Sequence, residues 1–110
     1  NATSTWSVIV MQGSGAVYGN TLIGGPAVAF LVHQDVNGPV DIFSNLALCG
    51  AAQQNGTLLR VDGAYAVKFY NNTAICPVDT QRAIFNLNKF PANSSIKNNY
   101  RRRGGRAQAM

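Results

Sequence analysis

At 110 residues, the chain is long enough for a single domain with its own hydrophobic core, and 46% of its residues are hydrophobic. Only 12% are charged and glutamate is absent, which argues against a helical protein, because surface helices rely on glutamate and lysine. The same shortage of carboxylates argues against the paired carboxylates of glycosidases.

The net charge of +5 is unevenly distributed. Residues 1–59 carry two aspartates and no lysine or arginine, whereas residues 60–110 carry all nine basic residues and two aspartates. Such asymmetry is typical of contact with an anionic surface or nucleic acid, although a basic end that only keeps the chain soluble gives the same pattern.

Short apolar segments separated by glycine-containing turns predict strands in the first half of the chain. We expect strands at Thr5–Met11, Pro26–His33 and Val40–Phe43, and a strand or single helical turn at Leu46–Cys49. The glycines after the first segment do not match a dinucleotide fingerprint, since the third one, Gly19, falls one position late. We therefore expect no cofactor, and we assign these glycines to hairpins or bulges.

The pair Asp62-Gly63 lies between two apolar segments, Thr57–Val61 and Ala64–Tyr70. Asp-Gly in this position is a strong signal for a β-hairpin with a type I′ turn. Tyr65 and Tyr70 in the second segment are candidate anchors for a partner, although packing in the core explains them equally well.

Two further strands are expected at Ala74–Val78 and Arg82–Leu87, and a short helix at Gln81–Asn88 is the alternative for the second. No segment keeps a 3.6-residue apolar period over three turns, and no internal repeat is evident. About seven short strands therefore predict an all-β fold, a small antiparallel β-sandwich or barrel.

The composition changes near Pro91, after which asparagine, serine, glycine and basic residues predominate. We expect a β domain over residues 1–91 and a flexible basic tail over residues 92–110.

Two cysteines and four Asn-x-Ser/Thr sequons favour an oxidising, extracellular compartment. We predict a disulfide between Cys49 and Cys76, with two buried free thiols as the alternative. The candidate glycosylation sites are Asn1, Asn55, Asn71 and Asn93. Because the chain starts at an asparagine, we expect a processed product from which a leader has been removed. No apolar stretch reaches 18 residues, so the sequence predicts no membrane-spanning helix.

The basic end carries the main candidate binding site. Its cationic groups, with a tyrosine that could stack on a base, could neutralise several phosphates or bind another anionic surface. The residues are Lys97, Tyr100, Arg101, Arg102, Arg103 and Arg106. The same arginines also match the multibasic sites that secretory proteases cleave.

Catalysis is not expected, because the one histidine, His33, has only Asp35 nearby and no serine lies in a nucleophile motif. No metal site is expected either. The sequence thus predicts a secreted, non-enzymatic binding domain, an effector, toxin-like factor or viral or microbial extracellular component that recognises an extracellular protein or an anionic surface. There are two alternatives. The first is a β-barrel that binds single-stranded nucleic acid. The second is a self-assembling coat or filament subunit, which would form a homo-oligomer.

Overall fold

The computed structural model describes residues 7–23, 28–48, 57–76, 85–103 and 106–109, and every regular element in these ranges is a strand. The strands are β1 Ser7–Met11, β2 Gly15–Tyr18, β3 Thr21–Ile23, β4 Val28–Val32, β5 Val40–Phe43, β6 Leu46–Leu48, β7 Thr57–Val61, β8 Val67–Tyr70, β9 Thr73–Cys76, β10 Phe85–Leu87, β11 Ser95–Lys97, β12 Tyr100–Arg103 and β13 Arg106–Ala109.

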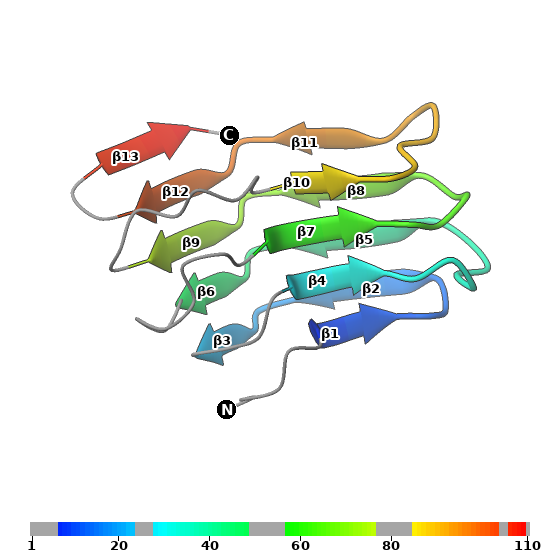
Figure 1. Cartoon of the computed structure of the whole chain (residues 1–110), viewed down its shortest axis with the longest axis horizontal. Helices are drawn as coiled ribbons and strands as arrows, with labels where there is room; N and C mark the ends of the chain where they lie inside the picture. The colour runs from blue at the N-terminus through cyan, green and yellow to red at the C-terminus, as the bar shows by residue number, and fades with distance from the viewer. Residues whose placement is uncertain (1–6, 24–27, 49–56, 77–84, 104–105, 110) are drawn as a thin grey trace.

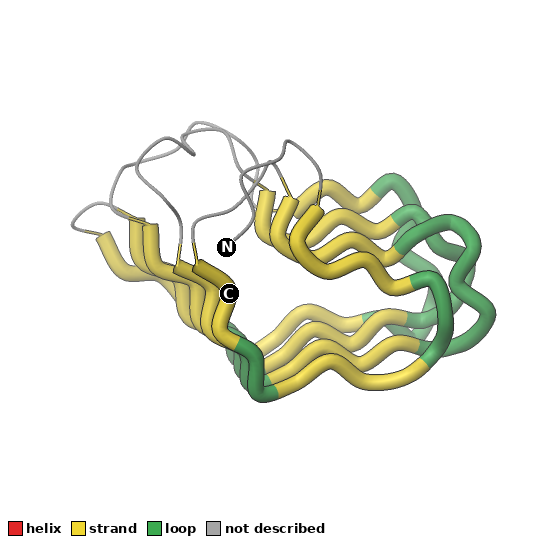
Figure 2. The backbone as a smooth tube through the Cα atoms, turned by 90° about the horizontal axis from the view of Figure 1, so that it is seen from below, coloured by secondary structure: helices red, strands yellow, loops and turns green. Residues whose placement is uncertain are grey.

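These strands form a β-solenoid with three sheets (Figure 1). Sheet 1 has the order β1-β4-β7-β10, sheet 2 the order β11-β8-β5-β2, and sheet 3 the order β13-β12-β9-β6-β3. The chain visits the three sheets in turn, so that each coil contributes one strand to each sheet. Coil 1 is β1–β3, coil 2 is β4–β6, coil 3 is β7–β9 and coil 4 is β10–β12. Figure 2 shows the coils nearly superimposed.

All pairings between coils are parallel, and only β13 runs antiparallel to its neighbour β12. Register between coils keeps equivalent side chains in rows along the solenoid axis. One inward row of sheet 1 joins Ile9, Phe30, Leu59 and Phe85. Parallel pairing therefore repeats each inward position once per coil.

Most of the core lies between the facing inner sides of sheets 1 and 2, and the inward row of sheet 3, Leu22, Ala47 and Ala74, belongs to the same cluster. Phe30, Leu59, Ile42 and Phe69 are at most 1% exposed. The ring of Phe69 makes edge-to-face contacts with Phe30, at a centroid distance of 5.8 Å, and with Phe85, at 6.0 Å. Such pairs each add about 0.5–1.5 kcal/mol to the burial of their area. Aromatic packing thus links coils 2, 3 and 4 across the interior.

The predicted antiparallel sandwich or barrel is wrong in topology, although the all-β class is confirmed. The strands alternate buried and partly exposed residues, as in β5 and β8, and this alternation reports one buried face irrespective of strand direction. Parallel neighbours need a long connection. Here the connection between two neighbouring strands of one sheet is the chain that passes through the other two sheets.

The predicted Asp62-Gly63 hairpin is also wrong. The strands on either side, β7 and β8, belong to different sheets. Gly63 does not have the positive φ that a type I′ turn needs. A Cβ at Gly63 would lie 2.5 Å from Val36 Cγ1 and 2.9 Å from the His33 carbonyl oxygen. The glycine is required by the close approach of the preceding coil.

The predicted flexible tail is a further error, because β11 and β12 form coil 4 of the solenoid and β13 follows them. The expected glycine loop near the start of the chain contains β2 and β3, which raises the strand count well above seven. No disulfide is found among the described residues; of the two predicted partners, Cys49 lies outside them.

Candidate binding groove

The corner between sheets 2 and 3 is built on a ladder of asparagines, one per coil: Asn20, Asn45, Asn72 and Asn99. The Oδ1 atom of Asn72 accepts hydrogen bonds from the backbone N–H and the Nδ2 of Asn45, at 3.1 and 2.9 Å. Asn99 Oδ1 accepts the same two bonds from Asn72, and Asn45 Oδ1 accepts them from Asn20. Each side chain therefore bonds the corner of its own coil to the corner of the coil before it.

The ladder also satisfies backbone carbonyls of the preceding coil. Asn72 Nδ2 donates to the Ile42 carbonyl at 3.0 Å, and Asn99 Nδ2 donates to that of Phe69 at 3.1 Å. Asn45, Asn72 and Asn99 are only 2–3% exposed. Buried amides of this kind are tolerated because their donors and acceptors are paired.

The residue before each ladder asparagine has a positive φ, between 55° and 69°. These residues are Gly19, Ser44, Asn71 and Asn98. Glycine and asparagine adopt this left-handed conformation most readily, which explains three of the four. Their row forms an external ridge, the corner ridge, that runs along the solenoid axis.

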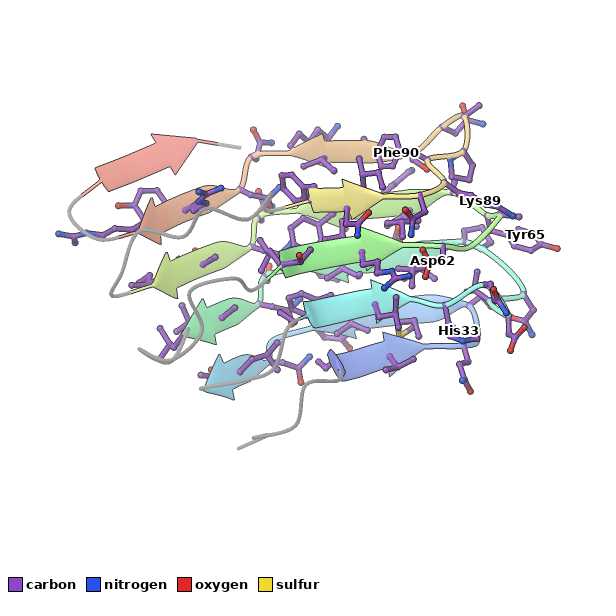
Figure 3. All side chains as sticks on the ribbon, in the orientation of Figure 1. His33, Asp62, Tyr65, Lys89 and Phe90 are labelled. Atoms are coloured by element: carbon purple, nitrogen blue, oxygen red, sulfur yellow. The ribbon has the colours of Figure 1, made fainter. Side chains whose placement is uncertain are left out.

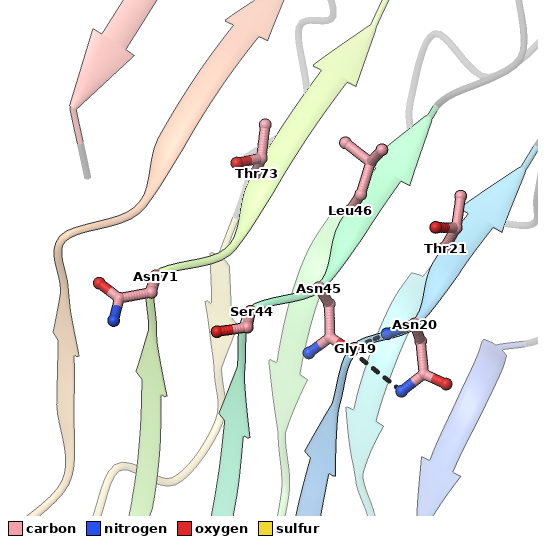
Figure 4. Close-up of a pocket in the computed structure, with 8 residues that line it drawn as sticks. All are labelled: Gly19, Asn20, Thr21, Ser44, Asn45, Leu46, Asn71 and Thr73. Atoms are coloured by element: carbon pink, nitrogen blue, oxygen red, sulfur yellow. Dashed lines mark hydrogen bonds between the residues drawn. The ribbon is translucent and has the colours of Figure 1, made fainter.

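A shallow groove of about 370 Å³ runs beside the corner ridge, on the side of sheet 3 (Figure 4). Gly19, Ser44 and Asn71 line it from the ridge, and Thr21, Leu46 and Thr73 line it from the outer face of sheet 3. Asn20 and Asn45 complete the lining. None of these residues is charged.

Several polar groups of the groove remain available to a ligand. Within the described chain, the side chains of Thr21, Ser44, Asn71 and Thr73 make no hydrogen bond, and all but the half-buried Thr73 are exposed. Parallel register places Thr21, Leu46 and Thr73 in one row with Tyr100 of coil 4. Successive positions in such a row are about 4.8 Å apart, so the groove offers hydroxyl and amide groups at the spacing of the coils.

A second row lies on the other side of the corner ridge, on the outer face of sheet 2. The rings of Tyr18, Phe43 and Tyr70 stack with centroids 5.0 and 5.1 Å apart and with interplanar angles of 10° and 5°. Lys97 continues the row in coil 4. Because Phe43 has a neighbouring ring on either side, this row acts mainly as an external support for the coils.

Charge changes along the solenoid axis. Coil 1 contains no charged residue among residues 7–23, coil 2 carries −2 from Asp35 and Asp41, and residues 57–76 of coil 3 carry +1. Residues 85–103 of coil 4 carry +5 with no aspartate. The sequence-level asymmetry is thus an axial gradient that ends on a basic coil.

Coil 4 contains most of the predicted anion-binding residues, although they point in different directions. Lys97 and Arg102 are exposed and Tyr100 is 42% exposed. Arg101 is only 7% exposed, because it occupies the inward row of Leu22, Ala47 and Ala74. Arg103 ends β12, and Arg106 begins β13.

Two of the predicted glycosylation sites, Asn71 and Asn93, are exposed and have positive φ, and Asn1 and Asn55 lie outside the described residues. Tyr70 belongs to the external ring row, whereas Tyr65, which is 47% exposed, lies in the β7–β8 turn at the far end of sheet 2 (Figure 3).

His33 contacts Asp35 in the β4–β5 turn, with Nδ1 3.4 Å from Oδ2. The same ring nitrogen accepts a hydrogen bond from the Asp35 backbone N–H at 3.1 Å. This turn lies at the opposite end of sheet 2 from the groove. No cluster of three potential metal ligands occurs in the described ranges.

The ladder and the groove were not predicted from the sequence, although a signal for them exists. The segments YGNTLI, FSNLAL and YNNTAI share an aromatic residue, a left-handed position, an asparagine and then the strand of sheet 3, and KNNYRR is a degenerate fourth copy. The asparagines are spaced 25, 27 and 27 residues apart. A period of 20 to 50 residues is typical of the repeats of a solenoid.

Comparison of the chain with protein-family models, with curated proteins and with solved structures finds no match. The described residues contain no helix that is long and apolar enough to cross a membrane. The groove is therefore the feature of this chain that points most directly to a function.

Proposed function

We propose that this chain is a non-enzymatic binding module whose groove holds a linear carbohydrate chain along the solenoid axis. The observation that carries the proposal is the set of hydroxyl and amide side chains in the groove that have no partner within the described protein: Thr21, Ser44, Asn71 and Thr73. A polyhydroxylated ligand can both donate to and accept from such groups.

The shape of the site supports a polymer rather than a small molecule. The groove is open and spans coils 1 to 3, and its polar positions recur from coil to coil. The corner ridge beside it is held rigid by the asparagine ladder. A rigid site loses little conformational freedom on binding, and repeated weak contacts along one chain add up by effective concentration.

An extracellular location remains part of this proposal. It is supported by the low charge content and by the exposed sequon at Asn93. Asn71 is assigned to the groove, where an attached glycan would block the ligand. Nucleic acid is a weaker candidate for the groove itself, because none of its lining residues is aromatic and a base has no ring there to stack on.

The proposal is tested by screening the protein against an array of linear polysaccharides and measuring affinities for the chains retained. Ser44→Ala removes a groove hydroxyl, and we expect a loss of affinity of about two- to tenfold, the value of one hydrogen bond. Ser14→Ala is the matched control, because Ser14 is also exposed but lies in the β1–β2 turn at the other end of sheet 2. Equal affinities of the two variants would contradict the proposal, as would the absence of any binding on the array.

Self-assembly is a second candidate, favoured by the sheet edges. Within the described residues, the outer edges of β1 and β10 in sheet 1, and of β2 and β11 in sheet 2, have no neighbouring strand. Such edges can pair with another chain. Sedimentation velocity over a concentration series tests this role, and a monomer at the highest concentration would count against it.

A further inference from the structure

We infer that the carbohydrate bound by the groove is anionic, and that Arg102 and Tyr100 of coil 4 form the subsite for one of its acidic groups. This inference rests on the proposed function and adds the ligand class. It starts from the outer face of sheet 3, where the groove row Thr21–Leu46–Thr73 continues directly into Tyr100.

Tyr100 extends the groove with an aromatic surface. Its side chain is 42% exposed, and its ring stacks on no other ring of the described chain. This contrasts with Tyr18 and Tyr70, whose rings stack against Phe43. A free ring at the end of a polar groove can pack against the apolar face of a sugar.

Arg102 lies two residues after Tyr100 on the same strand and therefore on the same outer face of the sheet. Its side chain is exposed and makes no ion pair within the described residues. Its register partner on β9 is the aliphatic Ile75, which is 38% exposed. The guanidinium thus stands beside an apolar row, with no carboxylate in that row to neutralise it.

The strands of sheet 3 as a whole carry arginines without carboxylates to balance them. The residues of β3, β6, β9, β12 and β13 include four arginines and no aspartate or glutamate. The net charge of −2 in coil 2 and of +5 in coil 4 places the favourable potential for an anion at the Tyr100 end of the groove. Arginine also suits a carboxylate or sulfate because its planar fork can donate two parallel hydrogen bonds.

The test uses polysaccharide pairs with the same sugar backbone, in which the carboxyl groups are either free or methyl-esterified: homogalacturonan with its methyl ester, and hyaluronan with its methyl ester. We expect the acidic member of a pair to bind more tightly, and Arg102→Gln to weaken only that member, by about two- to fivefold as for one exposed ion pair. The advantage of the acidic member should shrink as salt is added. Lys89→Gln is the matched control, because it removes the same charge from an exposed residue of the β10–β11 turn, far from the groove (Figure 3).

The outcomes separate the inference from the proposed function. Equal binding of the acidic and esterified chains, each weakened by Ser44→Ala, would overturn the anionic class and leave the carbohydrate groove in place. Failure of both members of each pair to bind would overturn the inference, whereas the proposed function falls only if no chain on the polysaccharide array binds. If Lys89→Gln weakens the acidic member as much as Arg102→Gln does, the attraction is diffuse and the subsite is refuted. A single-stranded oligonucleotide that binds as tightly as the acidic chains would also refute it, in favour of a general polyanion surface.

Discussion

The asparagine ladder makes a quantitative prediction for the variant Asn72→Ala. In the native protein, Asn72 Oδ1 accepts from the Asn45 backbone N–H at 3.1 Å, and Asn72 Nδ2 donates to the Ile42 carbonyl at 3.0 Å. Alanine removes these two bonds at a position that is 2% exposed, together with the bonds from Asn45 Nδ2 and to Asn99 Oδ1. The last two groups keep other partners, the Val17 carbonyl and the Asn72 backbone N–H. Asn45 N–H is then left buried without its acceptor, and the Ile42 carbonyl loses a donor.

A buried donor without an acceptor costs about 1–3 kcal/mol, and an ordinary lost hydrogen bond costs about 1 kcal/mol more. We therefore expect Asn72→Ala to lower the free energy of unfolding by about 2–4 kcal/mol. That is a large part of the roughly 5–15 kcal/mol by which a typical domain is stable.

Asn20→Ala at the end of the ladder is the control. Asn20 is exposed, and its side chain donates to Asn45 Oδ1 and to the Tyr18 carbonyl, both at 3.1 Å. Asn45 Oδ1 still accepts from the Asn20 backbone N–H after the substitution. No buried group is left unpaired, so the cost should stay below about 1 kcal/mol.

Urea unfolding followed by far-ultraviolet circular dichroism measures both variants. With a slope near 1.5 kcal/mol/M, the expected midpoint for Asn72→Ala falls by more than about 1 M, and that for Asn20→Ala by well under 1 M. Unchanged slopes would show that the comparison is between equivalent transitions. Equal midpoints for the two variants would refute the reasoning that burial of the ladder makes its bonds valuable.

Gly63→Ala should destabilise by about 1–3 kcal/mol in urea, because the new Cβ meets backbone at 2.9 Å, whereas Gly13→Ala, with its nearest atom at 3.9 Å, should not. Phe43→Ala removes two ring-stacking contacts and should lower the free energy of unfolding by about 1–3 kcal/mol beyond the loss of its buried area. Phe90→Ala is the control, because the Phe90 ring is exposed and stacks on no other ring of the described chain. Similar losses for the two variants would contradict the role of the ring row as a support for the coils. Trypsin should leave the bond after Arg101 intact in the native protein, since β12 is paired on both sides; rapid cleavage there by peptide mapping would favour a processing site.

The asparagines show why the repeat was missed. Residues 20, 45, 72 and 99 are nearly evenly spaced, but the residues between them differ from coil to coil, and the glycine-rich start and the basic end resemble loops and tails by composition. Asn98-Asn99 was assigned to the tail for this reason. The groove could not be predicted, since Thr21, Ser44 and Thr73 become neighbours only through parallel register.

The amino-acid sequence by itself determined that the protein is built from short strands with one buried face, and that its charge accumulates toward the end of the chain. Both are properties of local composition and of the two-residue period of a strand. Only the tertiary structure decided that the strands pair in parallel between coils, because a strand's alternation is the same whichever direction its neighbour runs. It also decided that Arg101 lies inside and Arg102 outside, since adjacent residues of β12 face opposite sides of the sheet and the register of coil 4 selects which side is the core.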